Sequence, residues 1–136
     1  MRNKRKLFRF ISIIALGCAV LFIAIKLILD LTFRRGLPGL PDVQSLLAPL
    51  KEQISDASAR ASLRPTSDNI GKLGMVYHSS AFYDKAAQCY KLAIKRNKSK
   101  WIWSYYLGYL NQEMGESDIA IESFGNVIKE NPAVYH

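Results

Sequence analysis

The feature that most constrains this chain is an apolar run without charge, which reads FISIIALGCAVLFIAI from Phe10 to Ile25. Lys26 interrupts the run, and three more apolar residues follow before Asp30. Residues 10–29 would form a helix about 30 Å long, which matches the hydrocarbon thickness of a bilayer. Lys26 lies near the end of this segment, where its ammonium group can reach the headgroups. The sequence therefore predicts one transmembrane helix that contacts the lipid bilayer through residues 10–29.

Two kinds of cleaved signal are the alternatives to a permanent anchor. A secretory signal has an apolar core of about 7–15 residues and a cleavage site with small residues. The core here is longer, and residues 27–36 offer no such site. Residues 15–18 (ALGC) are similar to a lipoprotein signal, but the residues after Cys18 stay apolar where a mature lipoprotein would become polar. We therefore expect an uncleaved anchor.

The charges that flank the apolar run predict its orientation. Five cations precede it, namely Arg2, Lys4, Arg5, Lys6 and Arg9. Only Arg34 and Arg35 follow closely. The positive-inside rule places the more basic end in the cytoplasm. We expect a single-pass protein of the cell (inner) membrane, with its N-terminus in the cytoplasm and its C-terminal part in the periplasm or outside the cell.

The same charges explain the net charge of +8 and argue against nucleic-acid binding. Residues 1–35 carry eight basic side chains and one acid, a net charge of +7. The other 101 residues carry eleven basic and ten acidic side chains, a net charge of +1. A nucleic-acid-binding domain needs its basic excess on the folded part. We therefore expect no nucleic-acid partner.

A connector comes after the predicted anchor. Residues 36–41 (GLPGLP) cannot continue a helix. Asp42 is a suitable N-cap, and apolar residues then recur at spacings of three and four up to about Leu63. Pro49 should kink this amphipathic helix or divide it into two pieces. Residues 66–68 (TSD) supply the cap of the next helix. The predicted segments are 1–35 for the basic tail and anchor, 36–66 for the linker and packing helix, and 67–134 for the C-terminal helical part.

A pattern with a period of 34 residues occupies residues 67–134. The equivalent residues are Leu73 and Leu107, Gly74 and Gly108, Ala86 and Ala120, Tyr90 and Phe124, and Ile94 and Ile128. Small residues at matched positions let antiparallel helices approach closely, and the large aromatic residues fill the space to the neighbouring unit. The turns fall at residues 79–81 and 114–117.

This pattern resembles the tetratricopeptide repeat family over residues 67–134, which is half of the chain. The resemblance implies an all-α fold, with the anchor helix followed by a short α-solenoid of two helix-turn-helix repeats, 67–100 and 101–134. The sequence departs from the family pattern at Ile70 and Ser104, where an aromatic residue is usual. The proline that usually ends a repeat is present in the second repeat as Pro132, but Lys98 takes its place in the first.

No pattern in the sequence predicts catalysis. His78 and His136 have no nucleophile and acidic partner at a recognisable spacing. Cys18 and Cys89 form no metal or haem motif, and the glycines form no phosphate loop. The carboxylates Glu113, Glu116 and Asp118 surround a turn and are expected to face solvent. We therefore expect a protein that is not an enzyme, with no catalytic residues, cofactor, metal site or small-molecule substrate.

The resemblance implies instead a groove that binds protein. The inner-face positions of the family predict partner contacts at Met75, His78, Ile102, Tyr105, Tyr109 and Gln112. Residues 117–130 carry more apolar side chains than one helix face can bury, so Ile121, Ile128 and Tyr135 are predicted to dock on another subunit or on a second copy. Five cations, Lys91, Lys95, Arg96, Lys98 and Lys100, are candidates for contact with anionic headgroups or an acidic neighbour, although a solvated face would also explain them.

These observations lead to two functional hypotheses. In the first, the chain is an accessory subunit or assembly scaffold of a membrane protein complex, and its partners are other protein subunits. In the second, it is a free-standing scaffold that recruits soluble periplasmic proteins or peptides through its groove. A small signalling or transport enzyme is a third class, which only activity of the isolated soluble part would support.

Overall fold

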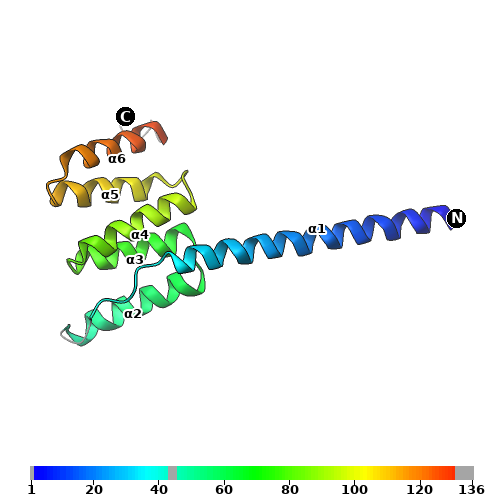
Figure 1. Cartoon of the computed structure of the whole chain (residues 1–136), viewed down its shortest axis with the longest axis horizontal. Coiled ribbons are helices and arrows are strands. Elements are labelled where there is room, and N and C mark those ends of the chain that lie inside the picture. The colour runs from blue at the N-terminus through cyan, green and yellow to red at the C-terminus, as the bar shows by residue number, and fades with distance from the viewer. Residues whose placement is uncertain (1, 43–45, 131–136) are drawn as a thin grey trace. The chain divides into compact units, whose positions relative to one another are not determined.

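The computed structural model describes the backbone of residues 2–42 and 46–130. Every regular element in these residues is a helix, which confirms the all-α prediction (Figure 1). The helices are α1 (Arg2–Arg35), α2 (Ala48–Leu63), α3 (Ser67–Ser79), α4 (Tyr83–Arg96), α5 (Trp101–Glu113) and α6 (Ser117–Glu130). The chain forms two compact units, residues 1–32 and residues 33–136.

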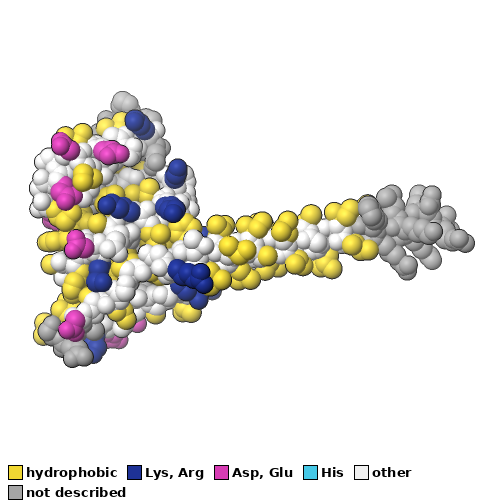
Figure 2. All heavy atoms as spheres, viewed as in Figure 1, with side chains coloured by type: hydrophobic (Ala, Val, Ile, Leu, Met, Phe, Trp, Pro, Cys, Tyr) yellow, Lys and Arg dark blue, Asp and Glu magenta, His cyan; other side chains and the backbone are white. Residues whose placement is uncertain are grey.

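The first unit consists of α1 up to Thr32. The segment Ile11–Arg35 of α1 is long and apolar enough to cross a membrane. Large apolar side chains such as Ile13, Leu16 and Phe22 are exposed along it, and hydrophobic atoms cover its visible surface (Figure 2). An exposed apolar surface of this size is unusual on a water-soluble unit.

The second unit begins with the last turn of α1. The helix ends at Arg35, just before Gly36, as expected. Phe33 is only 9% exposed and belongs to the core of the second unit. The sequence placed the boundary after Arg35, where the helix stops. The compact unit starts three residues earlier, because Phe33 packs against residues that lie far along the chain.

Residues 33–39 run antiparallel to α4, and we call this segment the strap. At one end, the guanidinium carbon of Arg96 lies 4.7 Å from the centre of the Phe33 ring. At the other end, Lys85 Nζ donates a hydrogen bond to the carbonyl oxygen of Gly39 at 2.7 Å. The strap therefore fixes the start of the second unit along the length of α4.

Helix α2 packs on α3 and differs in one respect from its prediction. Pro49 lies in the first turn, where its missing amide hydrogen leaves no helical hydrogen bond unmade. Pro49 does not interrupt α2, so the expected kink is not found. The alternative, a helix that starts anew at Pro49, agrees with the start of α2 at Ala48, and the shorter piece expected before it falls partly outside the described residues. The end at Leu63 agrees with the prediction, whereas the start predicted at Val43 lies outside the described residues. Ile54 and Ala61 are completely buried.

The remaining four helices form two helical hairpins with a regular period. Helices α3 and α5 each have 13 residues, α4 and α6 each have 14, and corresponding helices begin 34 residues apart. Thr66 caps α3, as predicted, by accepting a hydrogen bond from the amide of Asn69 at 3.2 Å. Helices α2 to α6 are stacked in chain order (Figure 1), and each packs on the next.

Glycine residues allow close contact within and between the hairpins. A Cβ atom on Gly74 would lie 2.8 Å from the Tyr90 ring, and one on Gly108 would lie 2.7 Å from the Phe124 ring. A Cβ atom on Gly71 would lie 2.4 Å from the buried Trp103 ring of the next hairpin. The aromatic residues therefore occupy space that any other residue at these positions would fill.

Candidate interaction groove

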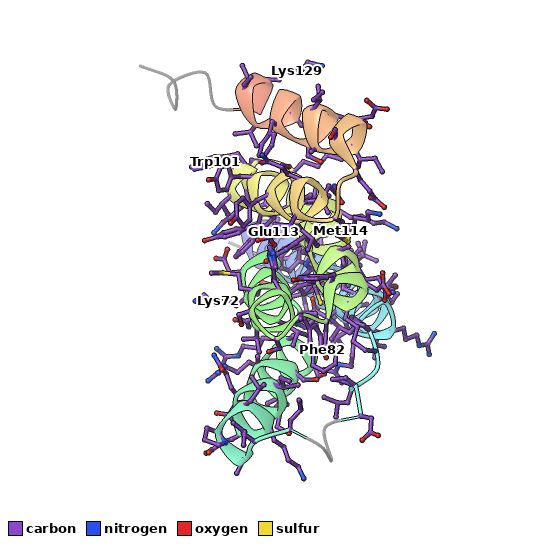
Figure 3. All side chains as sticks on the ribbon, turned by 90° about the vertical axis from the view of Figure 1, so that its left-hand side faces the viewer. Lys72, Phe82, Trp101, Glu113, Met114 and Lys129 are labelled. Atoms are coloured by element: carbon purple, nitrogen blue, oxygen red, sulfur yellow. The ribbon has the colours of Figure 1, made fainter. Side chains whose placement is uncertain are left out.

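A pocket of about 320 Å³ spans the two hairpins, and we call it the groove. Its lining comes from three helices: Met75, His78 and Ser79 of α3, Tyr83 and Tyr90 of α4, and Tyr106, Tyr109 and Glu113 of α5. Figure 3 shows Glu113 at the end of α5, on the side that faces α3. Neither hairpin alone contains the groove.

Helical spacing explains why these side chains meet. His78 and Ser79 follow Met75 by three and four positions, so the three residues share one face of α3. Tyr106, Tyr109 and Glu113 have the spacing i, i+3, i+7 and share one face of α5. The two faces are brought together because Trp103 of α5 packs directly over Gly71 of α3.

His78 lies at the centre of the groove wall. Its Nε2 atom lies 2.6 Å from Oε2 of Glu113, and its Nδ1 atom lies 3.3 Å from the hydroxyl of Tyr90. Its ring also makes edge contacts with Tyr83 and Tyr90 and a tilted contact with Tyr109, at centroid distances of 5.9, 6.1 and 5.9 Å. These contacts fix the orientation of the imidazole.

The electrostatic environment keeps the floor of the groove neutral. Burial raises the pKa of the Tyr90 phenol, and nearby Tyr106, Cys89 and Glu113 raise it further. The hydroxyl therefore stays protonated. Tyr83 and Tyr109 are exposed at the rim, so the groove offers flat aromatic surfaces beside hydrogen-bonding groups. Such a surface suits the side chains of a peptide or a protein helix.

The groove contains three of the six residues predicted from the repeat pattern to contact a partner, namely Met75, His78 and Tyr109. Ile102, Tyr105 and Gln112 do not line it. Ile102 is partly buried against the core, and the Tyr105 ring lies 6.0 Å from that of Phe124. Trp103 lies on the side of α5 that contacts α3, over Gly71.

Glu113, Glu116 and Asp118 are exposed, as predicted, but Glu113 also pairs with His78 at the wall of the groove, which was not predicted. Tyr83, Tyr90 and Tyr106 also line the groove and were not predicted to do so. One indication was present in the sequence. His78 and Glu113 are 35 residues apart, close to one repeat period, so they occupy neighbouring positions in consecutive repeats.

Helix α6 exposes large apolar side chains on both flanks of its buried face. Ala120 and Val127 are buried, whereas Ile119, Ile121 and Ile128 are exposed, Ile121 to 69%. The exposure of Ile121 and Ile128 agrees with their predicted role in docking, which stays a prediction. Tyr135, predicted to dock beside them, lies outside the described residues.

Among the residues that the structure describes, no group of three or more His, Cys, Asp or Glu side chains is placed to hold a metal ion. Comparison of the sequence with models of protein families gives no match. Comparison with curated proteins gives none either.

Proposed function

We propose that this chain is a membrane-anchored protein-interaction module of the tetratricopeptide type, without catalytic activity. It would act as an accessory subunit or assembly scaffold of a membrane protein complex. The observation that carries the proposal is a groove built by two consecutive helical hairpins, in a chain that begins with a helix long and apolar enough to cross a bilayer.

The regular period supports the assignment of the repeats. Four helices of nearly equal length begin at intervals that repeat every 34 residues, and a glycine of the first helix faces an aromatic residue of the second in each hairpin. Thirty-four residues is the period of tetratricopeptide repeats, whose concave faces bind extended chains or helices.

The exposed isoleucines of α6 support the role of subunit over that of free-standing scaffold. Repeat arrays bury a continuous core by stacking, and they usually need about three units and a polar capping helix. Here α6 packs on α5 and exposes three isoleucines. A neighbouring subunit would cover this surface. The alternative is a free-standing scaffold that binds soluble periplasmic clients or peptides through the groove.

The experiment places a photo-crosslinking amino acid at Tyr109, at the rim of the groove, in the full-length protein in its own cells. The matched control carries the same amino acid at Gln88, which is exposed on α4 about 200° around the helix from Tyr90. A discrete crosslinked protein from position 109 and none from position 88 would support the groove as the binding site. Equal products from both positions would contradict it.

Salt then separates the two versions of the function. A subunit should stay bound when membranes are solubilised in mild detergent and washed with salt, whereas a soluble client should be released.

The proposed topology is tested separately. Alkaline phosphatase fused at the C-terminus should be active if the repeats are in the periplasm, and inactive if they are in the cytoplasm.

A further inference from the structure

Several helix ends that are far apart in the sequence lie close together at one edge of the second unit. Asn69, at the start of α3, donates hydrogen bonds to the carbonyl oxygens of Arg60 and Arg64 at the end of α2, at 3.5 and 2.9 Å. Ser67 donates to the carbonyl oxygen of Ala93, near the end of α4, at 2.9 Å. The end of α2, the start of α3 and the end of α4 therefore lie together.

The same edge continues to the start of α5 and to the start of the strap. Lys100, which precedes α5, forms an ion pair with Asp68 of α3 at 2.6 Å. Arg96, the last residue of α4, covers the Phe33 ring. Because α6 runs antiparallel to α5 within its hairpin, the end of α6 also returns to this edge.

The edge is strongly basic, and we call it the basic edge. Its cationic residues are Arg34, Arg35, Arg60, Arg64, Lys95, Arg96, Lys98, Lys100 and Lys129. The opposite ends of the helices carry four acids, Asp84, Glu113, Glu116 and Asp118, and a cation, Lys85. In the second unit of Figure 2, most visible Lys and Arg side chains lie on one side and the Asp and Glu side chains on the other.

Helix dipoles explain part of this polarity, because cations are favourable at helix C-termini. They do not explain Lys98 and Lys100, which precede the N-terminus of α5, where a cation is unfavourable. Lys100 is compensated by Asp68. Lys98 is exposed in the turn between the hairpins. The basic edge is therefore more positive than helix stability requires.

The strap determines to which edge of the second unit α1 is covalently joined. Phe33 directly follows Thr32, and it lies at the Arg96 end of α4. Lys85, which holds the other end of the strap, is eleven residues earlier in α4, or about 16 Å along the helix. If α1 spans a bilayer, its exit point is therefore attached to the basic edge and not to the acidic one.

We infer that the basic edge binds the anionic phospholipid headgroups of the same bilayer that α1 crosses, an inference that rests on the proposed membrane anchor. The covalent connection keeps the cations close to the surface, so the headgroups are the anions at the highest effective concentration. Clusters of Lys and Arg next to a membrane span are attracted to anionic lipid over about one Debye length, roughly 10 Å. This binding would hold the second unit in one orientation on the membrane.

The test uses the full-length protein in lipid nanodiscs, made either of phosphatidylcholine alone or of a mixture with phosphatidylglycerol. The two tryptophans, Trp101 and Trp103, lie at the start of α5 next to Lys100, and they serve as energy donors to a dansyl group on lipid headgroups. We expect more energy transfer in the anionic discs than in the neutral ones. The difference should disappear when the salt concentration rises from about 0.05 M to about 0.5 M.

A pair of triple variants distinguishes the edge from the net charge. Arg64→Glu, Lys95→Glu and Lys98→Glu together reverse three exposed charges on the basic edge and leave the Lys100 and Arg96 contacts intact. Lys51→Glu, Lys72→Glu and Lys91→Glu together make the same change in net charge at exposed sites away from the helix ends that form the edge. The first variant should lose the gain in energy transfer, and the second should keep it. Thermal melting checks that both variants are folded.

Three outcomes would overturn the inference. Equal energy transfer in the two kinds of disc would show that the edge does not bind anionic lipid. Equal loss in both triple variants would show that net charge alone is responsible. Failure of the parent protein to co-elute with either disc would contradict the membrane anchor itself, and with it the proposed function, whatever the energy transfer shows.

Discussion

Nε2 of His78 lies 2.6 Å from Oε2 of Glu113, although the two residues are 35 positions apart and belong to different hairpins. The pair links α3 to α5 at the wall of the groove. The contact between the hairpins also includes the Asp68–Lys100 ion pair and apolar packing around Trp103 and Tyr90, whose rings are stacked at 6.5 Å. The His78–Glu113 contact therefore adds a polar link that forms only when α3 and α5 pack as observed.

A double-mutant cycle measures this link. His78→Ala and Glu113→Ala should show a coupling energy of about 0.2–1 kcal/mol, the range for ion pairs near the surface. The Glu113 side chain is 40% exposed, so solvent weakens the interaction. A second cycle with His78 and Glu116, which is exposed beyond the end of α5, should give no coupling. Urea unfolding provides the free energies, and equal coupling in both cycles would contradict a specific link.

Two helical glycines should respond in opposite directions to the same substitution. Gly108→Ala places a Cβ atom 2.7 Å from the Phe124 ring and should destabilise the protein by about 1–3 kcal/mol. A Cβ atom on Gly125 has no neighbour within 4 Å, so Gly125→Ala should stabilise α6 by about 0.5–1 kcal/mol. Melting curves test both changes. A harmless Gly108→Ala would mean that α5 and α6 do not make this close contact.

Removing the Phe33 side chain should destabilise the second unit although the residue belongs to α1. Phe33→Ala deletes a buried ring and should cost about 3–5 kcal/mol. Phe22→Ala is the matched control, because Phe22 is 70% exposed and lies in the first unit. Proteolysis of the repeats in detergent provides the measurement. If the two variants were digested at the same rate, Phe33 would not belong to the folded unit.

The buried Cys89 thiol should make stability depend on alkaline pH. Burial raises its pKa from 9.0 to about 12, so the folded state holds the proton up to about pH 12, whereas the unfolded state releases it from about pH 9. Stability is therefore complete below pH 9 and is lost as the pH rises between these values. Burial also raises the Tyr77 pKa, from 10.0 to about 12, which adds a loss that begins near pH 10.

Alkaline unfolding of a Cys89→Ala variant, followed by circular dichroism, tests this dependence, and its onset should come at higher pH than in the parent. Cys18→Ala is the control, because Cys18 is exposed in the first unit. An onset of unfolding at the same pH in the parent and in Cys89→Ala would contradict the linkage.

The exposed isoleucines of α6 should cause association. The fragment 33–136, which retains Phe33, should self-associate or bind a hydrophobic dye, and Ile121→Glu with Ile128→Glu should prevent this. Asp118→Lys with Glu122→Lys changes two exposed polar residues of the same helix and serves as the control. Sedimentation gives the oligomeric state. A parent fragment that is monomeric and binds no dye would remove this support for the role of subunit.

The sequence predicted the helices well because their determinants are local. Apolar spacing, the cap at Thr66 and the small residues at Gly74 and Gly108 act within a few turns or within one period. Pro49 lies in the first turn of α2 because a proline there leaves no helical hydrogen bond unmade. The groove was predicted only in part, because its shape depends on the rotation of α5. That rotation is set by the packing of Trp103 on Gly71, a contact between repeats that single-helix periodicity does not reveal.

The strap also sets an order of events during synthesis. Phe33 emerges directly after the apolar segment, but Arg96, which covers its ring, is made about sixty residues later. If α1 enters a membrane, its insertion and the folding of the two hairpins are therefore separate steps, and Phe33 has no partner in α4 during the interval. The last turn of α1 can join the folded unit only when the first hairpin is complete. The packing of the strap on α4 therefore marks the point at which the first hairpin has folded.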